Sequence, residues 1–450
     1  MNGLGYTNQV LTGWGRTSPS PSMVGAPAGR GLLQELVTST PARGVLARGA
    51  GRSYGDAAQN RDGYVVTPLT WPQIELDAAA GTVRACGSAS FTDLLAAVVP
   101  HGFILPVLPG TRHVTVGGAV AADVHGKNQR RDGSIAAWIE EIELLDGSGN
   151  LRRLTPDGDP GAFRATIGGM GLTGIILAAR IRLLPVRSAL MEVTSRRLAG
   201  LDALLDALDT AGSPYSVAWV DTTASGRSFG RGILDTGDHL PGPDPLREQD
   251  GLGYRPQRAR HAPAVPFCPI TPWSARGFNS LWFRKAPQEY RGVADLPTFF
   301  HRLDAVEGWN RAIGPRGLVQ YQFAVPEGAE KLITRALETV QRHRCAPFLG
   351  TLKRFGPASQ GPLSFPMPGW SLAIDLPAGN PGLAPALGDL DREVADAGGR
   401  VYLAKDARLG RAAFAAMYPQ AARWRADRDR LDPRGVFQSD LGRRLGLCGS

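Results

Sequence analysis

The spacing of apolar residues divides the chain into short strands and amphipathic helices. In the N-terminal part, apolar runs typical of strands lie at residues 44–47, 63–67, 82–86, 139–145, 151–154 and 172–184. The turn Asp146-Gly-Ser-Gly149 joins two of these runs and predicts a hairpin. Ser90 precedes an amphipathic segment over residues 91–99, which predicts a helix that begins at this cap and ends at His101-Gly102.

The pattern changes after Pro185. Strands are predicted at residues 318–325 and 370–375, and helices at 198–208, 327–343, 385–397 and 410–417. Residues 222–275 are rich in Gly, Pro, Arg and Asp and have weak periodicity, so we expect a long, mobile loop there. This mixture of strands and helices indicates an α+β fold whose first unit ends near residue 187.

Composition limits the classes of protein to which the chain can belong. Its 450 residues are enough for two or three domains, and 43% hydrophobic with 20% charged residues are typical of a globular protein. The net charge is +9, but acidic or apolar residues interrupt or flank the densest basic runs, at 423–430 and 443–444. We therefore interpret these charges as solvated helix faces and expect no nucleic-acid partner.

Cysteine spacing and the lack of long apolar runs bear on location. Cys86, Cys268, Cys345 and Cys448 are far apart and form no C-x-x-C pair, which predicts reduced thiols and no metal site. The first residues carry no signal-peptide pattern, and no apolar run reaches the ~18 residues that a membrane-spanning helix needs. We expect a cytoplasmic protein or one bound peripherally to a membrane.

Two glycine-punctuated segments carry the strongest chemical signal. They span residues 47–56 and 108–128. Glycine lacks a Cβ and tolerates positive φ, so main-chain N–H groups in such segments can approach an anionic ligand closely. Two of these segments in one chain predict a large phosphorylated cofactor rather than a lone phosphate.

Motifs in a fixed order make this prediction more specific. They are Thr12-Gly-Trp-Gly-Arg-Thr17, Gly51-Arg-Ser-Tyr-Gly-Asp56, Val107-Leu-Pro-Gly-Thr-Arg112, Asp123-Val-His-Gly-Lys-Asn128, Gln320-Tyr-Gln-Phe323, Pro368-Gly-Trp370 and Ala404-Lys-Asp406. Together they resemble the decaprenylphosphoryl-β-D-ribose 2′-oxidase family of vanillyl-alcohol-oxidase-type flavoenzymes. The resemblance implies a two-domain FAD-binding fold in which residues 1–187 and 400–450 bind FAD. Residues 188–399 would form a substrate-binding domain built on an antiparallel sheet.

FAD is the cofactor that the resemblance implies. The implied contacts are Ala47, Arg48, Gly49, Ala50, Gly51, Arg52, Ser53, Tyr54, Gly55, Asp56, Ala57, Gly110, Thr115, Val116, Gly117, Gly118, Ala122, Asp123, Val124, His125, Ile175 and Tyr402. Some relatives bind flavin covalently through a histidine near the end of the first loop, where this chain has Arg52, Ser53 and Tyr54. A guanidinium pairs with phosphate but cannot form that link, so we expect non-covalent FAD.

The resemblance also implies a reaction, the oxidation of the C2′ hydroxyl of a polyprenyl-phosphate-linked ribose to the 2′-keto sugar. A separate NADH-dependent reductase would complete the epimerisation to arabinose for cell-wall arabinan biosynthesis. Alcohol oxidation needs a hydride acceptor and a base for the hydroxyl proton. Lys405 is the candidate for the base or for a clamp on the substrate phosphate, and the pattern leaves both roles open. His125 and Tyr54 would orient the sugar near the flavin.

Further substrate contacts are expected in the second half of the chain. Gln320 and Gln322 are two apart on a predicted strand, so both amides face one side and can bind sugar hydroxyls. Lys353 is a candidate partner of the phosphate, and Trp219 and Ser371 are candidate pocket residues. Residues 222–275 are a candidate lid over the lipid tail.

Three positions depart from the family pattern. Ile313 stands where the family has Tyr, Ser371 where it has Asn and Ala373 where it has Cys. Each change shortens or removes a polar or reactive side chain, so we expect changes in pocket shape and hydrogen bonding rather than in flavin chemistry. The sugar and lipid therefore stay open, with two alternatives: an FAD-dependent oxidase of another sugar, alditol or aldonolactone, and a non-catalytic flavoprotein partner of a reductase.

Overall fold

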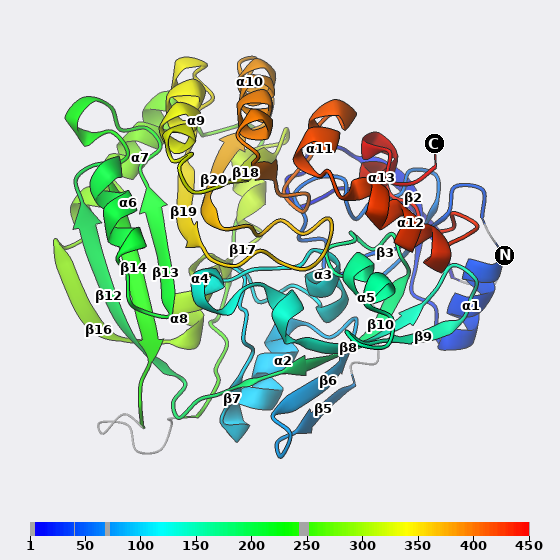
Figure 1. The fold of residues 1–450 in the computed structure, drawn as a ribbon. Coiled ribbons are helices and arrows are strands. Elements are labelled where there is room, and N and C mark those ends of the chain that lie inside the picture. Colours follow the sequence, from blue (N-terminus) through cyan, green and yellow to red (C-terminus); the bar gives the residue numbers. More distant parts are fainter. Residues whose placement is uncertain (1–4, 40, 68–72, 243–251, 450) are drawn as a thin grey trace.

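Strands and helices alternate along the chain and build three large sheets with helices around them (Figure 1). The computed structural model describes residues 5–39, 41–67, 73–242 and 252–449. The expectation about a signal peptide falls partly on residues 1–4, outside the described residues. The mixed helices and antiparallel sheets confirm the α+β fold class.

The first sheet carries the entry to the first glycine segment. Its strands, in the order β1-β2-β4-β3, are β1 (Thr7–Leu11), β2 (Ser20–Gly25), β4 (Tyr64–Val66) and β3 (Val45–Ala47). Helix α1 (Arg30–Thr38) buries Leu33, Leu36 and Val37 in the same apolar cluster as Val45 of β3. This packing fixes the end of β3, so the loop that follows leaves a rigid strand.

The second sheet is antiparallel and matches several predictions. Its strands, in the order β5-β6-β10-β8-β9, are β5 (Ile74–Asp77), β6 (Thr82–Cys86), β10 (Ile175–Arg182), β8 (Ile139–Leu145) and β9 (Leu151–Leu154). The β8–β9 hairpin is confirmed. Helix α2 (Phe91–Val98) begins at Ser90, whose side chain and that of Asp93 form a reciprocal capping box. The helices that follow are α3 (Val116–Ala121), α4 (Gln129–Asp132) and α5 (Pro160–Thr166).

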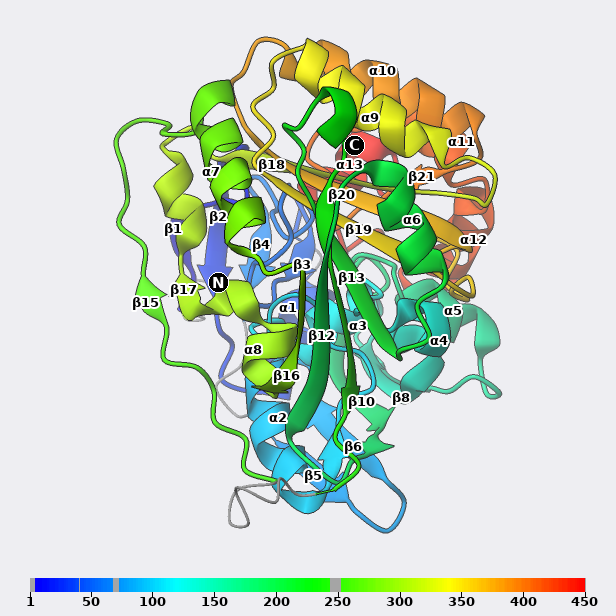
Figure 2. The ribbon, with the colours of Figure 1, turned by 90° about the vertical axis from the view of Figure 1, so that its left-hand side faces the viewer.

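The third sheet has eight antiparallel strands, in the order β16-β12-β14-β13-β19-β20-β18-β21. They are β16 (Glu289–Asp295), β12 (Leu190–Leu198), β14 (Gly232–His239), β13 (Tyr215–Val220), β19 (Leu349–Phe355), β20 (Gly369–Pro377), β18 (Leu318–Val325) and β21 (Arg400–Val401). One face packs against α6 (Leu201–Asp209), α9 (Lys331–Arg342) and α10 (Leu383–Asp396) in the main apolar core. Figure 2 shows these three helices on the same side of the sheet. The opposite face is therefore free to carry polar side chains toward a ligand.

The expectation of a long loop over residues 222–275 is wrong at Gly232–His239 and from Pro272 onward. Strand β14 lies inside it and pairs with both β12 and β13, and α7 (Pro272–Lys285) begins before it ends. Residues 243–251 of the same segment lie outside the described residues. A central strand cannot move as a lid, so the lid hypothesis fails for that part. The helix expected from residue 198 begins at Leu201, because Leu198 still belongs to β12.

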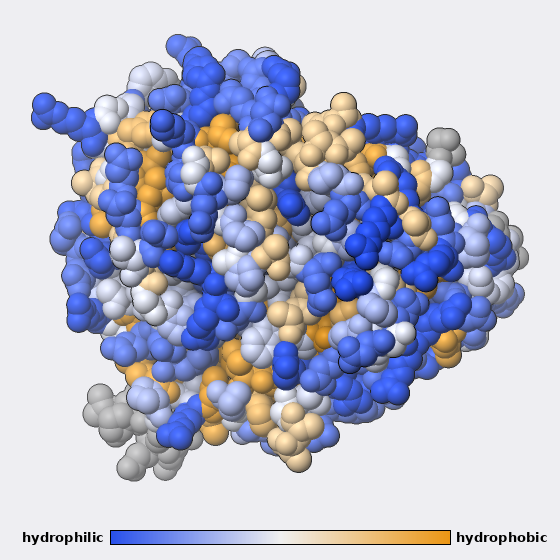
Figure 3. Space-filling view, in the orientation of Figure 1, coloured by the Kyte–Doolittle hydropathy of each residue, from blue (hydrophilic) through white to orange (hydrophobic). Residues whose placement is uncertain are grey.

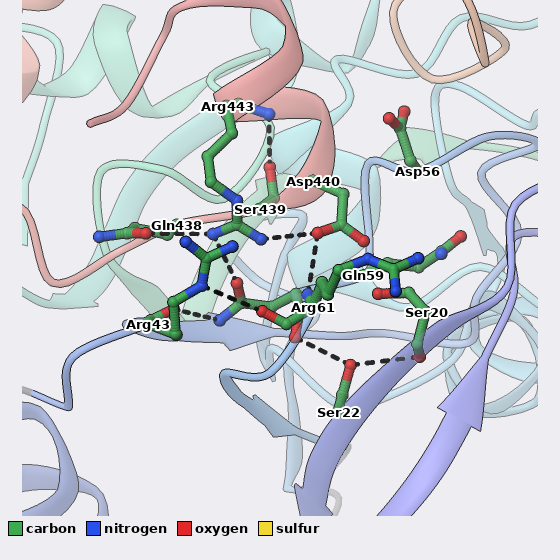
Figure 4. Close-up of polar contacts among 12 residues, drawn as sticks. Ser20, Ser22, Arg43, Asp56, Gln59, Arg61, Gln438, Ser439, Asp440 and Arg443 are labelled. Atoms are coloured by element: carbon green, nitrogen blue, oxygen red, sulfur yellow. Dashed lines mark hydrogen bonds and ion pairs between the residues drawn. The ribbon is translucent and has the colours of Figure 1, made fainter. Parts of the chain in front are cut away.

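The chain returns at its C-terminus to the first sheet. Helices α11 (Arg411–Met417), α12 (Ala421–Leu431) and α13 (Asp440–Leu445) form this part; α11 packs on α10 and β21, and α12, with its fully buried Trp424 ring, packs on α5. Val436 and Phe437, between α12 and α13, join the apolar cluster of the first sheet. Figure 4 shows how α13 is held: Arg443 donates to Asp440, which also accepts from the backbone N–H of Arg61 at 2.8 Å. The division into 1–187, 188–399 and 400–450 stays a prediction, although Arg400 and Val401 pair with β18 of the large sheet.

Short elements complete the chain. They are β7 (Phe103–Ile104), β11 (Leu184–Pro185), β15 (Arg260–His261), α8 (Leu296–Phe300), β17 (Val306–Glu307), and the 3₁₀ turns η1 (Val99–His101), η2 (Ile135–Trp138), η3 (Gly226–Ser228), η4 (Arg302–Ala305) and η5 (Trp309–Ile313). Among the described residues, no helix is both long and apolar enough to cross a membrane. Figure 3 shows hydrophilic side chains over most of one face, with apolar residues in small separate groups.

Candidate active site

A cavity of about 380 Å³ lies where the three large sheets meet. Its wall includes Ala47 of the first sheet, Cys86 of the second and Gln320 of the third, together with Lys405 from the C-terminal return. Such a position between sheets is typical of sites that hold a large ligand.

Most of the predicted site residues line this cavity. They are Ala47, Arg48, Gly49, Ala50, Gly51, Arg52, Ser53, Tyr54, Ala57, Gly110, Thr115, Gly117, Gly118, Ala122, Val124, His125, Ile175, Gln320, Gln322, Lys353, Ser371, Tyr402 and Lys405. The structure thus brings together residues that are hundreds of positions apart in the sequence.

Five predicted residues lie elsewhere. Gly55 packs against the backbone of Asp406, and Asp56 forms an ion pair with Arg444. Val116, the first residue of α3, is fully buried in the core. The carboxylate of Asp123 is buried and accepts from the N–H of Ala136 at 3.2 Å, so it shapes the loop before His125. Trp219 is on β13 opposite Thr351, one strand beyond the cavity wall.

The first glycine loop is held tightly on both sides. Gly51 has φ +64°, and a Cβ there would collide with the Arg48 guanidinium. Arg48 itself donates to the carbonyls of Ala58 at 2.7 Å and Thr12 at 2.8 Å. A Cβ at Gly49 would collide with the Thr115 hydroxyl. Glycine at position 49 therefore lets the loop reach the start of α3, and glycine at position 51 leaves room for the Arg48 guanidinium.

Strand register places the polar residues of the third sheet on one face. Gln320 pairs with Asp375 and Gln322 with Ala373 across β18 and β20, and Lys353 pairs with Ser371 across β19 and β20. Because residues opposite each other point to the same side, all of these side chains face the cavity side.

Two hydrogen-bonded groups cross from this face to the two glycine-punctuated segments. The Gln320 amide donates to both oxygens of Asp375 at 2.9 and 3.0 Å and to the Tyr54 hydroxyl at 3.3 Å. The Gln322 amide donates to the Ser371 hydroxyl at 3.3 Å and lies 3.2 Å from Nε2 of His125. The aromatic rings and amides of the site are therefore fixed before any ligand binds.

Burial shifts the pKa values of the charged groups here. It lowers the pKa of Lys405 to about 8, an effect that Asp375 opposes. Burial, aided by Lys405, lowers the pKa of Lys353 to about 8. It also raises the pKa of Asp375 to about 6, with Gln320 and Lys405 opposing the shift. In this group two buried amines share one buried carboxylate, so this part of the wall favours an anionic ligand near neutral pH.

His125 is a neutral, oriented ring. Burial and the two lysines hold its pKa well below the usual value. Phe355, Phe365 and Tyr402 surround the ring at centroid distances of 5.0 to 5.5 Å. Among the residues that the structure describes, none is hydrogen-bonded to its Nδ1. That buried nitrogen is therefore left without a partner in the described part of the chain.

Comparison with known proteins assigns the family. Residues 21–155 match the FAD binding domain family. The chain is 39% identical to the decaprenylphosphoryl-β-D-ribose oxidase of Mycolicibacterium smegmatis, over 98% of this chain and 98% of that protein. The chain belongs to the decaprenylphosphoryl-β-D-ribose oxidase family. It is an FAD-dependent oxidoreductase, which confirms the cofactor and enzyme class expected from the motifs.

Two other relatives match a smaller part of this chain. An uncharacterized protein in the mprA 5′ region of Streptomyces coelicolor is 40% identical over 78% of this chain and 98% of that protein. The alditol oxidase of a Streptomyces species is 29% identical over 43% of this chain and 46% of that enzyme. The likeness to alditol oxidase thus covers less than half of either chain.

The cavity of this decaprenylphosphoryl-β-D-ribose oxidase family member fits FAD. Glycines allow close approach of the first loop, and the Arg52 guanidinium stacks 4.2 Å from the Trp14 ring centre. Its buried Nε has no hydrogen-bond partner among the described residues. Arg52, the loop backbone and Thr115 would hold the phosphates of FAD, and Ile175 and Tyr402 would contact its ring systems.

Asp375 is one of several residues at the site that the motifs did not indicate; Asp304 and Trp309 on the cavity wall are others. Asp375 is 1% exposed and lies at the centre of the hydrogen bonds from Gln320. The signal was present, since Ser371, Ala373 and Asp375 alternate along β20 and share one face. Of the three family departures, Ser371 and Ala373 line the cavity, whereas Ile313 packs beside Tyr54 and Leu318.

Proposed function

We propose that this protein oxidises the C2′ hydroxyl of a polyprenyl-phosphate-linked ribose to the 2′-keto sugar. The observation that carries the proposal is the polar face of the third sheet, where two amides and two buried amines meet His125 and Tyr54 on one cavity wall. Amides suit sugar hydroxyls and the amines suit a phosphate. The family relationship supports the same substrate class.

FAD, when bound, supplies the acceptor for the hydride that leaves the carbinol carbon. The chain's own residues orient the sugar: Gln322 and His125 line the cavity, and Ser371 fixes the Gln322 amide. FAD is held without a covalent bond, because the first loop presents Arg52, Ser53 and Tyr54 where covalent relatives have a histidine.

Lys405 is proposed as the base that accepts the hydroxyl proton. Its amine lies 4.1 Å from the centre of the Tyr54 ring and close enough to Asp375 for that carboxylate to raise its pKa. A proton that arrives on Lys405 is therefore stabilised by a buried anion. Burial and Lys405 lower the pKa of Lys353, and no carboxylate among the described residues opposes them. The Lys353 amine thus has no buried anion among them as a partner, which makes it suitable as the partner of the substrate phosphate.

The product implies two partners. A keto sugar on a lipid carrier needs a reductase to complete an epimerisation, and an NADH-dependent enzyme is the proposed consumer. A substrate with a polyprenyl tail lies in a membrane, so the protein is proposed to work peripherally at its surface.

Anaerobic flavin bleaching tests the proposed substrate. A short-chain polyprenylphosphoryl ribose should reduce the flavin, whereas free ribose and alditols should reduce it much more slowly. The arabinose epimer is the matched control for C2′ stereochemistry. Reduction by free alditols alone would identify an alditol oxidase instead, and no reduction by any sugar would indicate a non-catalytic flavoprotein.

A further inference from the structure

Helix α7 exposes aromatic side chains that contribute little to the core. Only Ala275 and Asn279, one turn apart, are buried on this 14-residue helix. Trp273 is 82% exposed and Phe278 is 60% exposed, and Leu281 and Trp282 are exposed beside them. A capping box at Thr271 and Ser274 keeps the helix formed despite this exposure. Scattered apolar residues need no explanation, but two tryptophans and a phenylalanine on one short helix do.

The same segment is purely basic. Residues 252–288 contain no Asp or Glu, and their exposed Lys and Arg residues are Arg255, Arg258, Arg260, Arg276, Arg284 and Lys285. Aromatic rings with interspersed cations are the composition of surfaces that rest in the interface of an anionic bilayer. A second copy of the chain would bring like charges together across a symmetric contact, which disfavours a dimer through this face.

This face is continuous with the active-site cavity. Cys268 and Ile270, just before α7, pack with Tyr54 and Trp309, and Trp309 lines the cavity. Strand β15 pairs with β17, and the neighbouring Leu303 is 48% exposed while it also lines the cavity. Figure 2 shows α7, β15 and β17 on one side of the molecule. An apolar path therefore leads from the surface to the site.

We propose that α7 and the basic segment before it form the docking face for an anionic lipid bilayer, from which the polyprenyl-linked substrate enters the cavity. The docking face is defined by Trp273, Phe278, Leu281 and Trp282 with the six basic residues named above. The entry of substrate rests on the proposed function, whereas adsorption to the bilayer does not.

Vesicle flotation of the FAD-loaded enzyme tests the docking face. The enzyme should float with phosphatidylcholine vesicles that contain phosphatidylglycerol and much less with phosphatidylcholine alone. The double variant Trp273→Ser/Phe278→Ser should bind at least about tenfold more weakly, since its exposed rings no longer enter the interface. Arg276→Gln/Arg284→Gln should reduce the preference for phosphatidylglycerol. The matched control is Leu151→Ser, a 47% exposed leucine on β9 at the other end of the molecule (Figure 1).

Flavin content and turnover of a water-soluble substrate analogue should be unchanged in both double variants. Binding of the aromatic variant equal to that of the parent would overturn the proposal, as would a parent that ignores phosphatidylglycerol vesicles at low ionic strength. A parent dimer that becomes monomeric in the aromatic variant would assign the face to a second copy and also overturn it. If the enzyme binds vesicles but no polyprenyl sugar reduces its flavin, the proposed function is wrong and the docking face still stands.

Discussion

Lys405 and Asp375 are two residues with buried charged groups, and the charge of each one changes the pKa of the other. Burial lowers the pKa of Lys405 to about 8 and raises the pKa of Asp375 to about 6, and each charge opposes the shift of its partner. Between these values the pair is an ammonium beside a carboxylate. Above about pH 8 the amine is mostly neutral and can accept a proton.

The pH dependence of flavin reduction should follow Lys405. For a base, kcat/KM rises with pH and levels off above about 8, because only the neutral amine takes the hydroxyl proton. Stopped-flow reduction between about pH 6 and pH 10 measures this rise. Lys405→Ala should lower the rate by about 10²–10⁴ while FAD stays bound. A rate that instead falls above pH 8 would assign Lys405 as an ammonium clamp.

Asp375→Asn provides the companion measurement. Loss of the carboxylate removes the charge that raises the pKa of Lys405, so the midpoint of the pH profile should move to lower pH. Ser371→Ala, on the same strand and face but without charge, should leave the midpoint in place. An unchanged midpoint in Asp375→Asn would mean that another group titrates.

Single residues differ in how far the sequence reveals them. Lys405 and His125 lie in compact motifs, so a resemblance over a few positions was enough to select them. Asp375 acquires its environment from Gln320 and Tyr54, 55 and 321 positions away, and no local pattern carries that information. Trp219 is predicted to be a pocket aromatic, but it lies on β13, and the cavity wall ends at the neighbouring strand β19.

At the scale of elements, the first glycine loop should control flavin binding. Gly51→Ala forces a Cβ into the Arg48 guanidinium at φ +64°, so it should displace the loop and lower the flavin content of the purified protein. Gly398→Ala is the matched control. Gly398 has φ +71° and open space around a Cβ, so its variant carries a similar backbone strain of about 1–2 kcal/mol without the collision. Absorbance of bound flavin per protein measures both, and equal loss in the two variants would attribute the effect to strain alone.

Elements with local signals could be predicted, and β14 could not. The Ser90 cap and the Asp146-Gly-Ser-Gly149 turn act within a few residues, so α2 and the β8–β9 hairpin were found. In β14, Gly232 and Gly237 make the strand resemble a loop. A Cβ at Gly237 would lie 2.7 Å from the Phe299 ring, so tertiary packing requires the residue that hides the strand.

At the scale of the whole molecule, FAD should stabilise the fold, because residues of all three sheets line its cavity. A ligand that binds only the folded state raises the free energy of unfolding by RT ln(1 + [L]/Kd), which is about 2.7 kcal/mol at a ligand concentration of 100 times Kd. We expect acid to release all of the yellow colour into the supernatant, and the flavin-free protein to melt several degrees lower than the loaded one. Added FAD should restore Tm. The Lys405→Ala variant should show the same rise in Tm when FAD binds, because this substitution affects catalysis rather than cofactor binding. Colour that stays with the precipitated protein would mean a covalent flavin, and His125, the histidine on the cavity wall with a free Nδ1 among the described residues, would then be the first attachment site to examine.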